Sequence, residues 1–352
     1  MAHSELHYPS PITGERTPES TNYLQILPFA TDPILARQFL MIDEDIVGNI
    51  RFGKILEILD KVAENTALAY VHCFYPDARV VTAAIDSIVL RSLSDTTQNL
   101  LFSAKINYVG KTSMEVGIRV EHVGPCPCHV ASCYFTMVAR STTEAKSLEL
   151  PPLAYPTPDA QKRFDKATAR KQEYRKSLEI AEQMPSLEEY LFLKRLHKEQ
   201  ESPDFSGLRA SKLVAESVGR AYPEQENVPK TIFGGHLIRR GYELSAIAAD
   251  MVATDRAVPI RVNRINFAQP VMLGDLHHFT ARVVYTGKTT IAVQCDIERI
   301  SRDRSVRAMS NSCLFTFQNV GPDLETKPVP FIYPATYAED ERFLNAYRQR
   351  ID

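Results

Sequence analysis

The sequence contains an internal repeat, and this feature limits the possible folds more than any other. The segment Phe102–Val123 aligns without a gap on Phe279–Ile300, 177 residues later, and both carry Tyr-x-Gly-Lys-Thr at the same place. At the same spacing, Ile88 falls on Ile265. Chance does not produce a match of this length. We therefore expect one structural unit to be present twice in the chain.

The first copy has the pattern of one helix followed by several antiparallel strands. A short strand is expected at Tyr23–Leu27, then a polar, mixed segment to Glu44, and then a helix from Ile50 to about Tyr70. Turn residues separate the strand-like runs that follow. These runs are Val80–Leu90, Leu101–Val109, Ser113–Val123 and Val130–Val138.

The repeat and its flanking segments divide the chain into five parts. Residues 1–20 are rich in Pro, Ser and Thr, and they are expected to form a flexible N-terminal arm. The two repeated domains are expected at 21–145 and 206–335, with a C-terminal tail at 336–352. A Pro-rich and charged helical linker is expected at 146–205. Its stretch Asp159–Glu201 is interpreted as solvated helices, with a binding arm as the alternative.

The composition excludes several classes of protein. Hydrophobic residues make up 44% of the 352 residues and charged residues 24%, which is typical of a folded globular protein. The net charge of −2 shows no basic excess, so a nucleic-acid partner is not expected. No apolar run approaches the roughly 18 residues that a membrane-spanning helix needs. The N-terminus has neither an apolar signal core nor an arginine-rich presequence, so a cytoplasmic location is possible.

The six cysteines do not form the framework of a disulfide-rich protein, and reduced thiols in an intracellular protein are expected. The nearest approach to a metal motif is Cys126–His129, with the sequence Cys-Pro-Cys-His. Its Cys-x-Cys spacing is too close for an ordinary zinc site, and no matching pair occurs. We expect neither a metal nor a cofactor.

Two adjacent glycines, Gly234 and Gly235, precede a helix rich in Leu, Ile and Ala. Glycines at a helix entry allow close approach of another backbone or a ligand, and the free amides there favour negative charge. The site suits a developing oxyanion. Tight packing at a helix entry is the alternative. The first copy has a related stretch, in which Gly53 aligns with Gly235 and Asp60 aligns with Tyr242, one residue before Glu243.

The ordered set of these motifs resembles the two-hot-dog acyl-CoA thioesterases of the mitochondrial type. The matching segments are RFGKILEILD (51–60), VTAAIDSI (81–88), YVGKTSMEV (108–116), SKL (211–213), IFGGHLIRRGYEL (232–244) and NFAQPVMLGD (266–275). The resemblance implies an α+β fold of two fused hot-dog units, each a long helix wrapped by a curved antiparallel sheet. It also implies hydrolysis of fatty acyl-CoA to free acid and CoA, a homo-oligomer such as a trimer of double hot-dog chains, and the mitochondrial matrix as the compartment.

Thioester hydrolysis needs an activated water and a stabilised oxyanion, but little acid assistance, because a thiol with a pKa near ~8.5 leaves readily as thiolate. Asp60 is the first choice as the base. The resemblance implies that it faces Gly234, Gly235 and His236, whose backbone amides would stabilise the oxyanion. A surface acid paired with Lys54 or Lys61 is the alternative for Asp60.

Glu243 is the candidate base of a second site, where it would face Asn49 and Gly53. It lies one residue after the usual helix carboxylate position, so that site is either active, remodelled or silent. Asn49 orients water, binds the thioester carbonyl or caps the helix. His236 either acts as a base or is packed or solvated.

Binding of CoA is expected at the helix entries and at the repeated Gly-Lys-Thr turns. These turns lack the upstream glycine of a phosphate loop, so a simple strand turn is the alternative. The candidate substrate-binding residues are Gly53, Gly234, Lys111, Thr112, Ser113, Lys288, Thr289 and Arg239. The rival functions are a hot-dog acyl-thioester dehydratase or hydratase and a non-catalytic acyl-CoA-binding protein.

Overall fold

A computed structural model describes residues 6–7, 16–44, 46–92, 94–124, 127–144, 146–181, 183–228, 230–263 and 265–350. The chain forms two compact units. The first comprises residues 1–172, 224–239 and 264–268, and the second comprises residues 173–223, 240–263 and 269–352. Two short segments of the second half, 224–239 and 264–268, belong to the first unit, so the compact units are not continuous in sequence. The domain bounds 21–145 and 206–335, with the linker at 146–205, stay a prediction.

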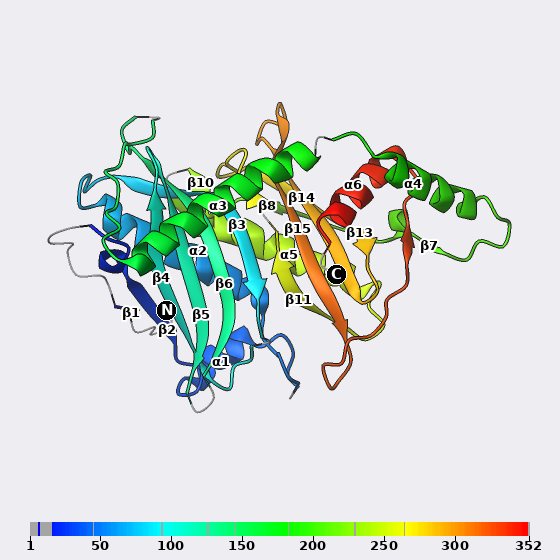
Figure 1. Cartoon of the computed structure of the whole chain (residues 1–352), viewed down its shortest axis with the longest axis horizontal. Helices are drawn as coiled ribbons and strands as arrows, with labels where there is room; N and C mark the ends of the chain where they lie inside the picture. Colours follow the sequence, from blue (N-terminus) through cyan, green and yellow to red (C-terminus); the bar gives the residue numbers. More distant parts are fainter. Residues whose placement is uncertain are drawn as a thin grey trace. The chain divides into compact units, whose positions relative to one another are not determined.

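The first unit is a central helix, α2 (Phe52–Val71), packed against one antiparallel sheet (Figure 1). Inward-facing side chains of the sheet, such as Phe102, Ala104 and Ile106, are fully buried, whereas Ser103 and Lys105 on the other face are partly exposed. This alternation is the period-two pattern of a half-covered sheet. The strand order is β1 (Leu6–His7), β2 (Tyr23–Leu27), β4 (Asn99–Val109), β5 (Ser113–Val123), β6 (Cys128–Arg140), β3 (Arg79–Leu90) and β12 (Ile265–Asn266).

The second unit repeats this arrangement. Helix α5 (Gly234–Asp250) enters this unit at Arg240, and Tyr242 packs its ring against Phe315 and Phe317 of the sheet. The strand order is β8 (Val214–Arg220), β13 (Leu276–Thr286), β14 (Thr290–Ile300), β15 (Arg307–Val320) and β11 (Arg256–Val262), all antiparallel. This order matches β2, β4, β5, β6 and β3 of the first unit, whose sheet also carries the short strands β1 and β12.

The predicted repeat is confirmed at the level of single residues. The β4–β5 pairing shifts register between Ile106 and Tyr108, and the β13–β14 pairing shifts between Val283 and Tyr285, the same place in the alignment. Both hairpins also close identically, with the Gly110 amide donating to Ser113 and the Gly287 amide donating to Thr290 (2.7 and 2.9 Å). The two fused hot-dog units expected from the sequence are therefore present.

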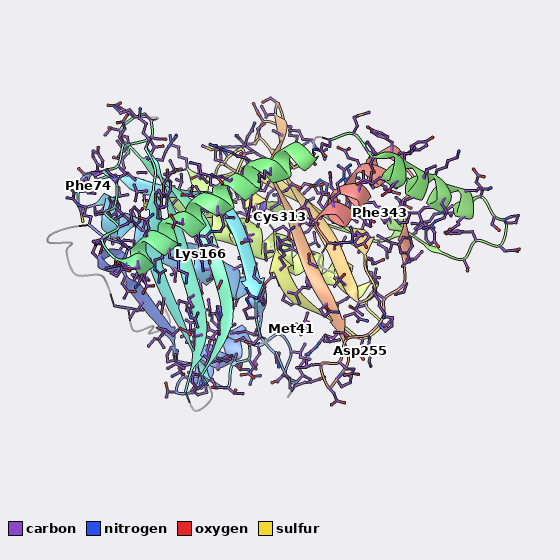
Figure 2. All side chains as sticks on the ribbon, in the orientation of Figure 1. Met41, Phe74, Lys166, Asp255, Cys313 and Phe343 are labelled. Carbon is purple, nitrogen blue, oxygen red and sulfur yellow. The ribbon has the colours of Figure 1, made fainter. Side chains whose placement is uncertain are left out.

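The segment predicted as a C-terminal tail contains a packed helix, α6 (Tyr337–Arg348). Phe343 is fully buried in an apolar cluster with Leu193 and Leu196 of α4 (Leu187–Gln200). Arg348 forms a two-point ion pair with Glu189. The apolar residues of α6 recur at helical spacing and form one face, which packs against α4 within the second unit. Phe343 is labelled in Figure 2.

The predicted linker is helical but not simply solvated. It contains α3 (Pro158–Ala181) and α4. In the first unit, Phe164 of α3 packs against Tyr108 of the sheet and Tyr155.

One further helix, α1 (Pro33–Phe39), was not predicted, although Asp32 caps it by accepting from the Leu35 amide and Pro33 starts it. Of the N-terminal arm, residues 1–5 and 8–15 lie outside the described residues, and Leu6–His7 pairs with β2. Among the described residues, none of the helices is long and apolar enough to span a membrane. The remaining strands are β7 (Leu208–Arg209), β9 (Glu226–Val228), β10 (Thr231–Ile232) and β16 (Ile332–Tyr333).

Candidate active site

Asp60 lies in the third turn of α2 and is completely buried. The Thr82 hydroxyl on β3 donates a hydrogen bond to its Oδ1 atom at 2.5 Å. The other carboxylate oxygen, Oδ2, has no well-aligned hydrogen-bond partner among the described residues. A buried carboxylate oxygen without a partner is costly, and such atoms occur mainly where a ligand or water binds.

The Gly234–Gly235 turn, which starts α5, lies directly against this carboxylate within the first unit. A β-carbon on Gly234 would meet the Phe267 ring at 2.9 Å and Asp60 Oδ2 at 3.5 Å. A β-carbon on Gly235 would meet the Phe233 ring at 2.6 Å and Asp60 Cβ at 3.1 Å. Only glycine therefore fits at these positions without displacing either an aromatic ring or the acid.

The helix entry supplies few free amides, because its first turn is already partly bonded. The Phe233 amide donates to the Gln225 carbonyl at 2.8 Å, and the His236 amide donates to the Phe233 carbonyl at 3.2 Å. The His236 amide, one of the expected oxyanion donors, is therefore already engaged, and the predicted role of the His236 side chain stays a prediction. The amide of Gly234 has no acceptor among the described residues, and the amide of Gly235 interacts with Asp60.

Burial raises the pKa of Asp60 from 3.8 to about 6, since desolvation penalises the ionised form. The Thr82 hydroxyl opposes this by stabilising the carboxylate, while the nearby charge of Glu64 raises the pKa further. The Gly235 amide and Lys61 lower it by smaller amounts. The result is a carboxylate that is ionised near neutral pH and is more basic than an exposed aspartate. This suits proton transfer from water.

Two aromatic residues surround the Asp60 carboxylate and the glycine turn, and the sequence analysis gave neither a role. Phe267 follows β12, which pairs with β3, and its amide donates to the Ala83 carbonyl at 3.1 Å. Phe233 precedes the glycines, with the Lys61 ammonium 5.9 Å from its ring centroid. Together with Thr82, these residues hold the acid and the glycine turn in one place.

Comparison with known proteins supports the fold and the chemistry. Residues 232–305 match the model of the thioesterase superfamily. Human mitochondrial acyl-coenzyme A thioesterase 9 is 28% identical over 93% of this chain and 76% of its own length. The acyl-CoA thioester hydrolase YciA of Salmonella typhimurium is 32% identical over 31% of this chain and 85% of its own length.

The chain belongs to the hot-dog acyl-CoA thioesterase family. The mouse mitochondrial acyl-coenzyme A thioesterase 9 is similar to this thioesterase at 29% identity over 93% of the chain and 76% of its own length. The fold of this thioesterase also resembles that of the 12:0-ACP thioesterase of Umbellularia californica, with a TM-score of 0.51 and 8% identity over 85% of this chain and 97% of the other.

Arg239 has a different partner in this thioesterase from the one predicted. It was expected to contact CoA, but its guanidinium forms an ion pair with Glu57 of α2 at 2.9 Å, and both side chains are largely buried. Glu57 lies one turn before Asp60. We interpret the ion pair as a contact that holds the first turn of α5 against α2.

Asn49 has a structural role, and the expected roles as water ligand or helix cap are wrong. Its side-chain oxygen accepts from the amides of Met41 and Ile42, and its amide nitrogen donates to the carbonyls of Ile42 and Glu44. Asn49 is 4% exposed, and the N-cap position of α2 is occupied by Arg51, whose side chain forms no capping hydrogen bond. The four hydrogen bonds use its bonding capacity fully, so none remains for a substrate.

Replacing Asn49 by alanine is expected to lower the free energy of unfolding by about 2–3 kcal/mol, because several buried backbone groups lose their partner. The kcat of the folded variant should stay within about twofold of wild type. Urea denaturation measured beside the thiol-release rate tests this. An Asn49→Ala protein with unchanged stability but a strongly reduced kcat would show that Asn49 has a catalytic role.

The Gly-Lys-Thr turns close hairpins in this thioesterase. The carbonyls of Thr112 and Thr289 accept from Ala139 and Asn319, which ties each turn to the neighbouring strand. The side chain of Lys111 pairs with Glu149 in solvent, and Lys288 is exposed. Ser113 begins β5, which is separated by β6 from β3, the strand that carries Thr82. The structure thus favours the strand-turn interpretation, and the predicted contacts of Lys111, Thr112, Ser113, Lys288 and Thr289 with CoA stay a prediction.

Among its described residues, the second unit has no counterpart of the Asp60–Thr82 pair. Tyr242 stands where the alignment expects the acid, and burial against the sheet raises its pKa far above the usual range. At the place of Thr82, which pairs with Met137, the second unit has Pro259 paired with Phe317. The buried tyrosine that replaces the acid cannot serve as a base, and the proline that replaces Thr82 has no hydroxyl to donate.

Glu243 is partly exposed and lies 3.8 Å from Arg240, one turn back on α5. Gly53 lies in the first turn of α2, about 10 Å before Asp60 along the helix axis. The pairing predicted between Glu243 and the turn at Asn49 and Gly53 stays a prediction. Of the Cys126–His129 motif, Cys126 lies outside the described residues.

Proposed function

We propose that Asp60 activates the water with which this enzyme hydrolyses acyl-CoA to a free acid and CoA. The proposal rests mainly on one observation. A fully buried carboxylate, held at Oδ1 by Thr82, presents its unpartnered Oδ2 beside the Gly234–Gly235 turn. This arrangement places a base near pKa 6 next to backbone donors at the positive end of a helix.

The chemistry follows from these groups. Asp60 takes a proton from water bound at Oδ2, and the hydroxide attacks the thioester carbonyl carbon. The carbonyl electron pair moves to oxygen, and the amide of Gly234 stabilises the oxyanion, while the amide of Gly235 interacts with Asp60. Collapse restores the carbonyl, breaks the carbon–sulfur bond and releases CoA thiolate. The proton on Asp60 then passes to the thiolate or to solvent, which regenerates the carboxylate.

We propose one competent site for each chain. The second unit has Tyr242 and Pro259 in place of the acid and its donor, and Glu243 occupies a partly buried position one residue further on the helix. A step of one residue turns a side chain by about 100° around the helix axis. Glu243 therefore lacks the buried environment that gives Asp60 its basicity.

Glu243→Gln is expected to keep thiol release from acyl-CoA within about twofold of wild type, since the substitution keeps the size and removes only the charge. A spectrophotometric free-thiol assay over acyl-CoA esters of different lengths measures this and also tests the activity itself. A loss of half or more of the turnover with unchanged KM would show a second working site. A wild-type protein that binds acyl-CoA but releases no thiol would contradict the hydrolase proposal.

The compartment is proposed from the relatives alone. The human and mouse relatives carry mitochondrial names, and we place this enzyme in the mitochondrion on that similarity. The homo-oligomer expected from the family stays a prediction.

A further inference from the structure

The outer face of the first unit's sheet carries a cleft of about 910 Å³. Its walls come from α3 on one side and from strands β4, β5 and β6 on the other (Figure 1). The strand residues that line it, such as Ser103 and Lys105, alternate with the buried residues that face α2. The cleft therefore lies on the face of the sheet opposite to Asp60.

Basic side chains line both walls of the cleft. Helix α3 contributes Lys162, Arg163, Lys166 and Arg170, whose spacing places them on one helix face. Lys166 is labelled on this helix in Figure 2.

The opposite wall contributes Arg91, Lys105 of β4 and Arg119 of β5. Lys105 lies opposite Gly117, two residues from Arg119 on β5, so the two cations are diagonal neighbours in the sheet. Only two acidic side chains, Glu19 and Asp159, belong to the same lining.

Most of these cations have no carboxylate partner. Arg170 pairs with the buried Glu115 and stacks on the Tyr134 ring, with its guanidinium carbon 3.6 Å from the ring centroid. Arg119 pairs with Glu121 at 2.8 Å. Among the described residues, the remaining five basic side chains of the lining form no ion pair: Arg91, Lys105, Lys162, Arg163 and Lys166.

Two basic surfaces thus face each other in a protein whose net charge is −2. Like charges brought together in this way repel, and an anion between them would remove the repulsion.

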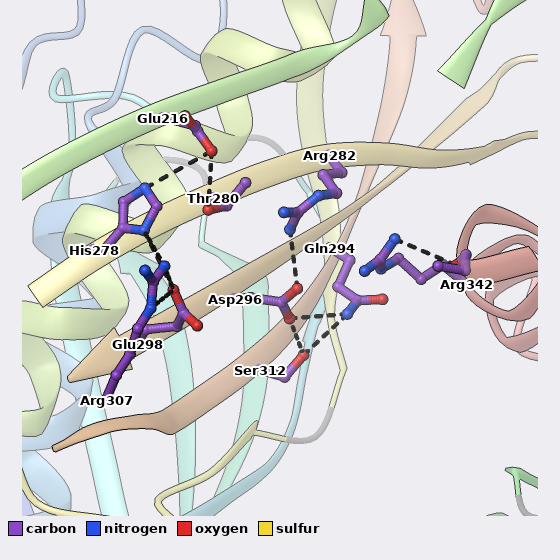
Figure 3. A network of polar contacts seen from close by, with 11 residues as sticks. Glu216, His278, Thr280, Arg282, Gln294, Asp296, Glu298, Arg307, Ser312 and Arg342 are labelled. Atoms are coloured by element: carbon purple, nitrogen blue, oxygen red, sulfur yellow. Dashed lines mark hydrogen bonds and ion pairs between the residues drawn. The ribbon is translucent and has the colours of Figure 1, made fainter. Parts of the chain in front are cut away.

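The second unit shows that the basic excess is not a property of the repeat. The counterparts of Lys105 and Arg119 are Arg282 and Asp296, and these two form an ion pair at 3.1 Å (Figure 3). Gln294 and Ser312 also donate to Asp296. The charge on this outer face is therefore neutralised within the second unit.

The neighbouring residues on the same outer face of the sheet also differ between the two units. Asn107 and Glu115 are replaced by Val284 and Ala292, which pack against Ala346 of α6. The second unit therefore covers this face with an apolar helix, while the first unit leaves a basic cleft.

We propose that this cleft binds a small anion that carries two or more linked phosphate groups. Arginine and lysine are the usual phosphate ligands, and several unpaired cations on two walls match charge spread over linked phosphates better than one carboxylate. The volume lies within the roughly 300–1,000 Å³ of small-molecule sites and exceeds what a single phosphate needs. The Ser103 and Ser132 side chains in the lining add hydroxyl donors. The site is separate from the proposed hydrolytic site and does not depend on it.

Isothermal titration of the full chain with inorganic triphosphate and with ATP tests the proposal. Saturable binding of one molecule per chain is expected, and the tighter of the two probes distinguishes an inorganic chain from a nucleotide. Lys105→Ala/Lys166→Ala should weaken binding at least about tenfold, because each lysine supplies a charge-assisted contact. The control Lys194→Ala/Lys198→Ala removes the same charge from α4 and should change binding by less than about twofold.

Thermal melting guards against loss of folding. The Lys105→Ala/Lys166→Ala protein should melt no lower than wild type without ligand, since it loses repulsion, and triphosphate should raise the melting temperature of wild type only. Its KM for acyl-CoA should stay within about twofold of wild type. The proposal is overturned if neither probe saturates below about 10 mM at physiological salt. It is also overturned if the control variant weakens binding equally, or if KM rises about tenfold, which would assign these lysines to the acyl-CoA site.

Discussion

Asp60→Asn is expected to lower kcat for acyl-CoA hydrolysis at least about a hundredfold, because general-base catalysis contributes roughly 10²–10⁴-fold and the amide cannot accept the proton. The affinity for acyl-CoA should stay near that of wild type, since asparagine has nearly the same shape as aspartate. The free-thiol assay measures the rate, and titration of acyl-CoA into the inactive variant measures binding.

The stability of this variant provides an independent check. The folded-state pKa of Asp60 is raised from 3.8 to about 6, so the buried charge costs folding free energy of about 3 kcal/mol above pH 6. That cost disappears as the pH falls from about 6 to below 4. Asp60→Asn should therefore be at least as stable as wild type at pH 7.5, and a loss of activity cannot be ascribed to unfolding.

Asp86→Asn is the matched control for Asp60→Asn. Asp86 lies on β3 and also accepts a hydrogen bond from a threonine, Thr136, at 2.8 Å. Asp86 is not among the atoms nearest to a β-carbon at Gly234 or Gly235, so its substitution should leave kcat within about threefold of wild type. Equal losses in Asp60→Asn and Asp86→Asn would contradict a chemical role for Asp60.

Gly235→Ala is expected to lower kcat/KM about a hundredfold or more, with the fold retained. The new methyl carbon would lie 2.6 Å from the Phe233 ring and 3.1 Å from Asp60 Cβ, so the ring, the acid or the helix entry must shift. A displacement of about 1 Å at a reacting group can cost about a hundredfold in rate. Steady-state kinetics and circular dichroism of the variant measure the two parts of this expectation.

Gly241→Ala is the control on the same helix. It distinguishes a local steric clash at Gly235 from a general effect of a glycine-to-alanine substitution on α5. There the nearest atoms to an added methyl group are Cys295 Sγ at 3.5 Å and Ile297 Cδ1 at 3.7 Å, which are ordinary contacts. Alanine should stabilise the helix interior by about 0.5–1 kcal/mol and leave activity unchanged. If Gly235→Ala is as active as Gly241→Ala, the glycine turn does not position Asp60.

The fold was predictable because the same pattern of helix and strands occurs in both copies of the repeat, so each copy supports the interpretation of the other. An alignment that superimposes Tyr108 on Tyr285 carries the hairpin, its bulge and its turn with it, and short-range periodicity supplies the strands. The helix α6 was not predicted, because its amphipathic pattern is short and gains its stability from α4 and β13, which are distant in sequence. Such tertiary contacts leave no local signal.

The site was predictable only where backbone chemistry demanded a residue type. Gly234 and Gly235 stand out because a side chain cannot fit there, and Asp60 stands out as an acid in an apolar helix. Thr82 was missed, although its place between Val80 and Ala84 on the inward face of β3 was a usable signal, a hydroxyl in an apolar row. Asn49 was assigned wrongly because its partners at Met41, Ile42 and Glu44 belong to a loop whose path no pattern reveals.

The pH dependence of kcat/KM in wild type and in Thr82→Val tests the central claim most directly, because it reports the ionisation of the essential base in the free enzyme. The account predicts an acid limb with a midpoint near pH 6 in wild type, since Asp60 must be ionised. Removing the Thr82 hydroxyl, which lowers the pKa of Asp60, should move that midpoint upward by about one pH unit. A wild-type midpoint near pH 4, or a midpoint that Thr82→Val does not move, would contradict the assignment of Asp60 as the base.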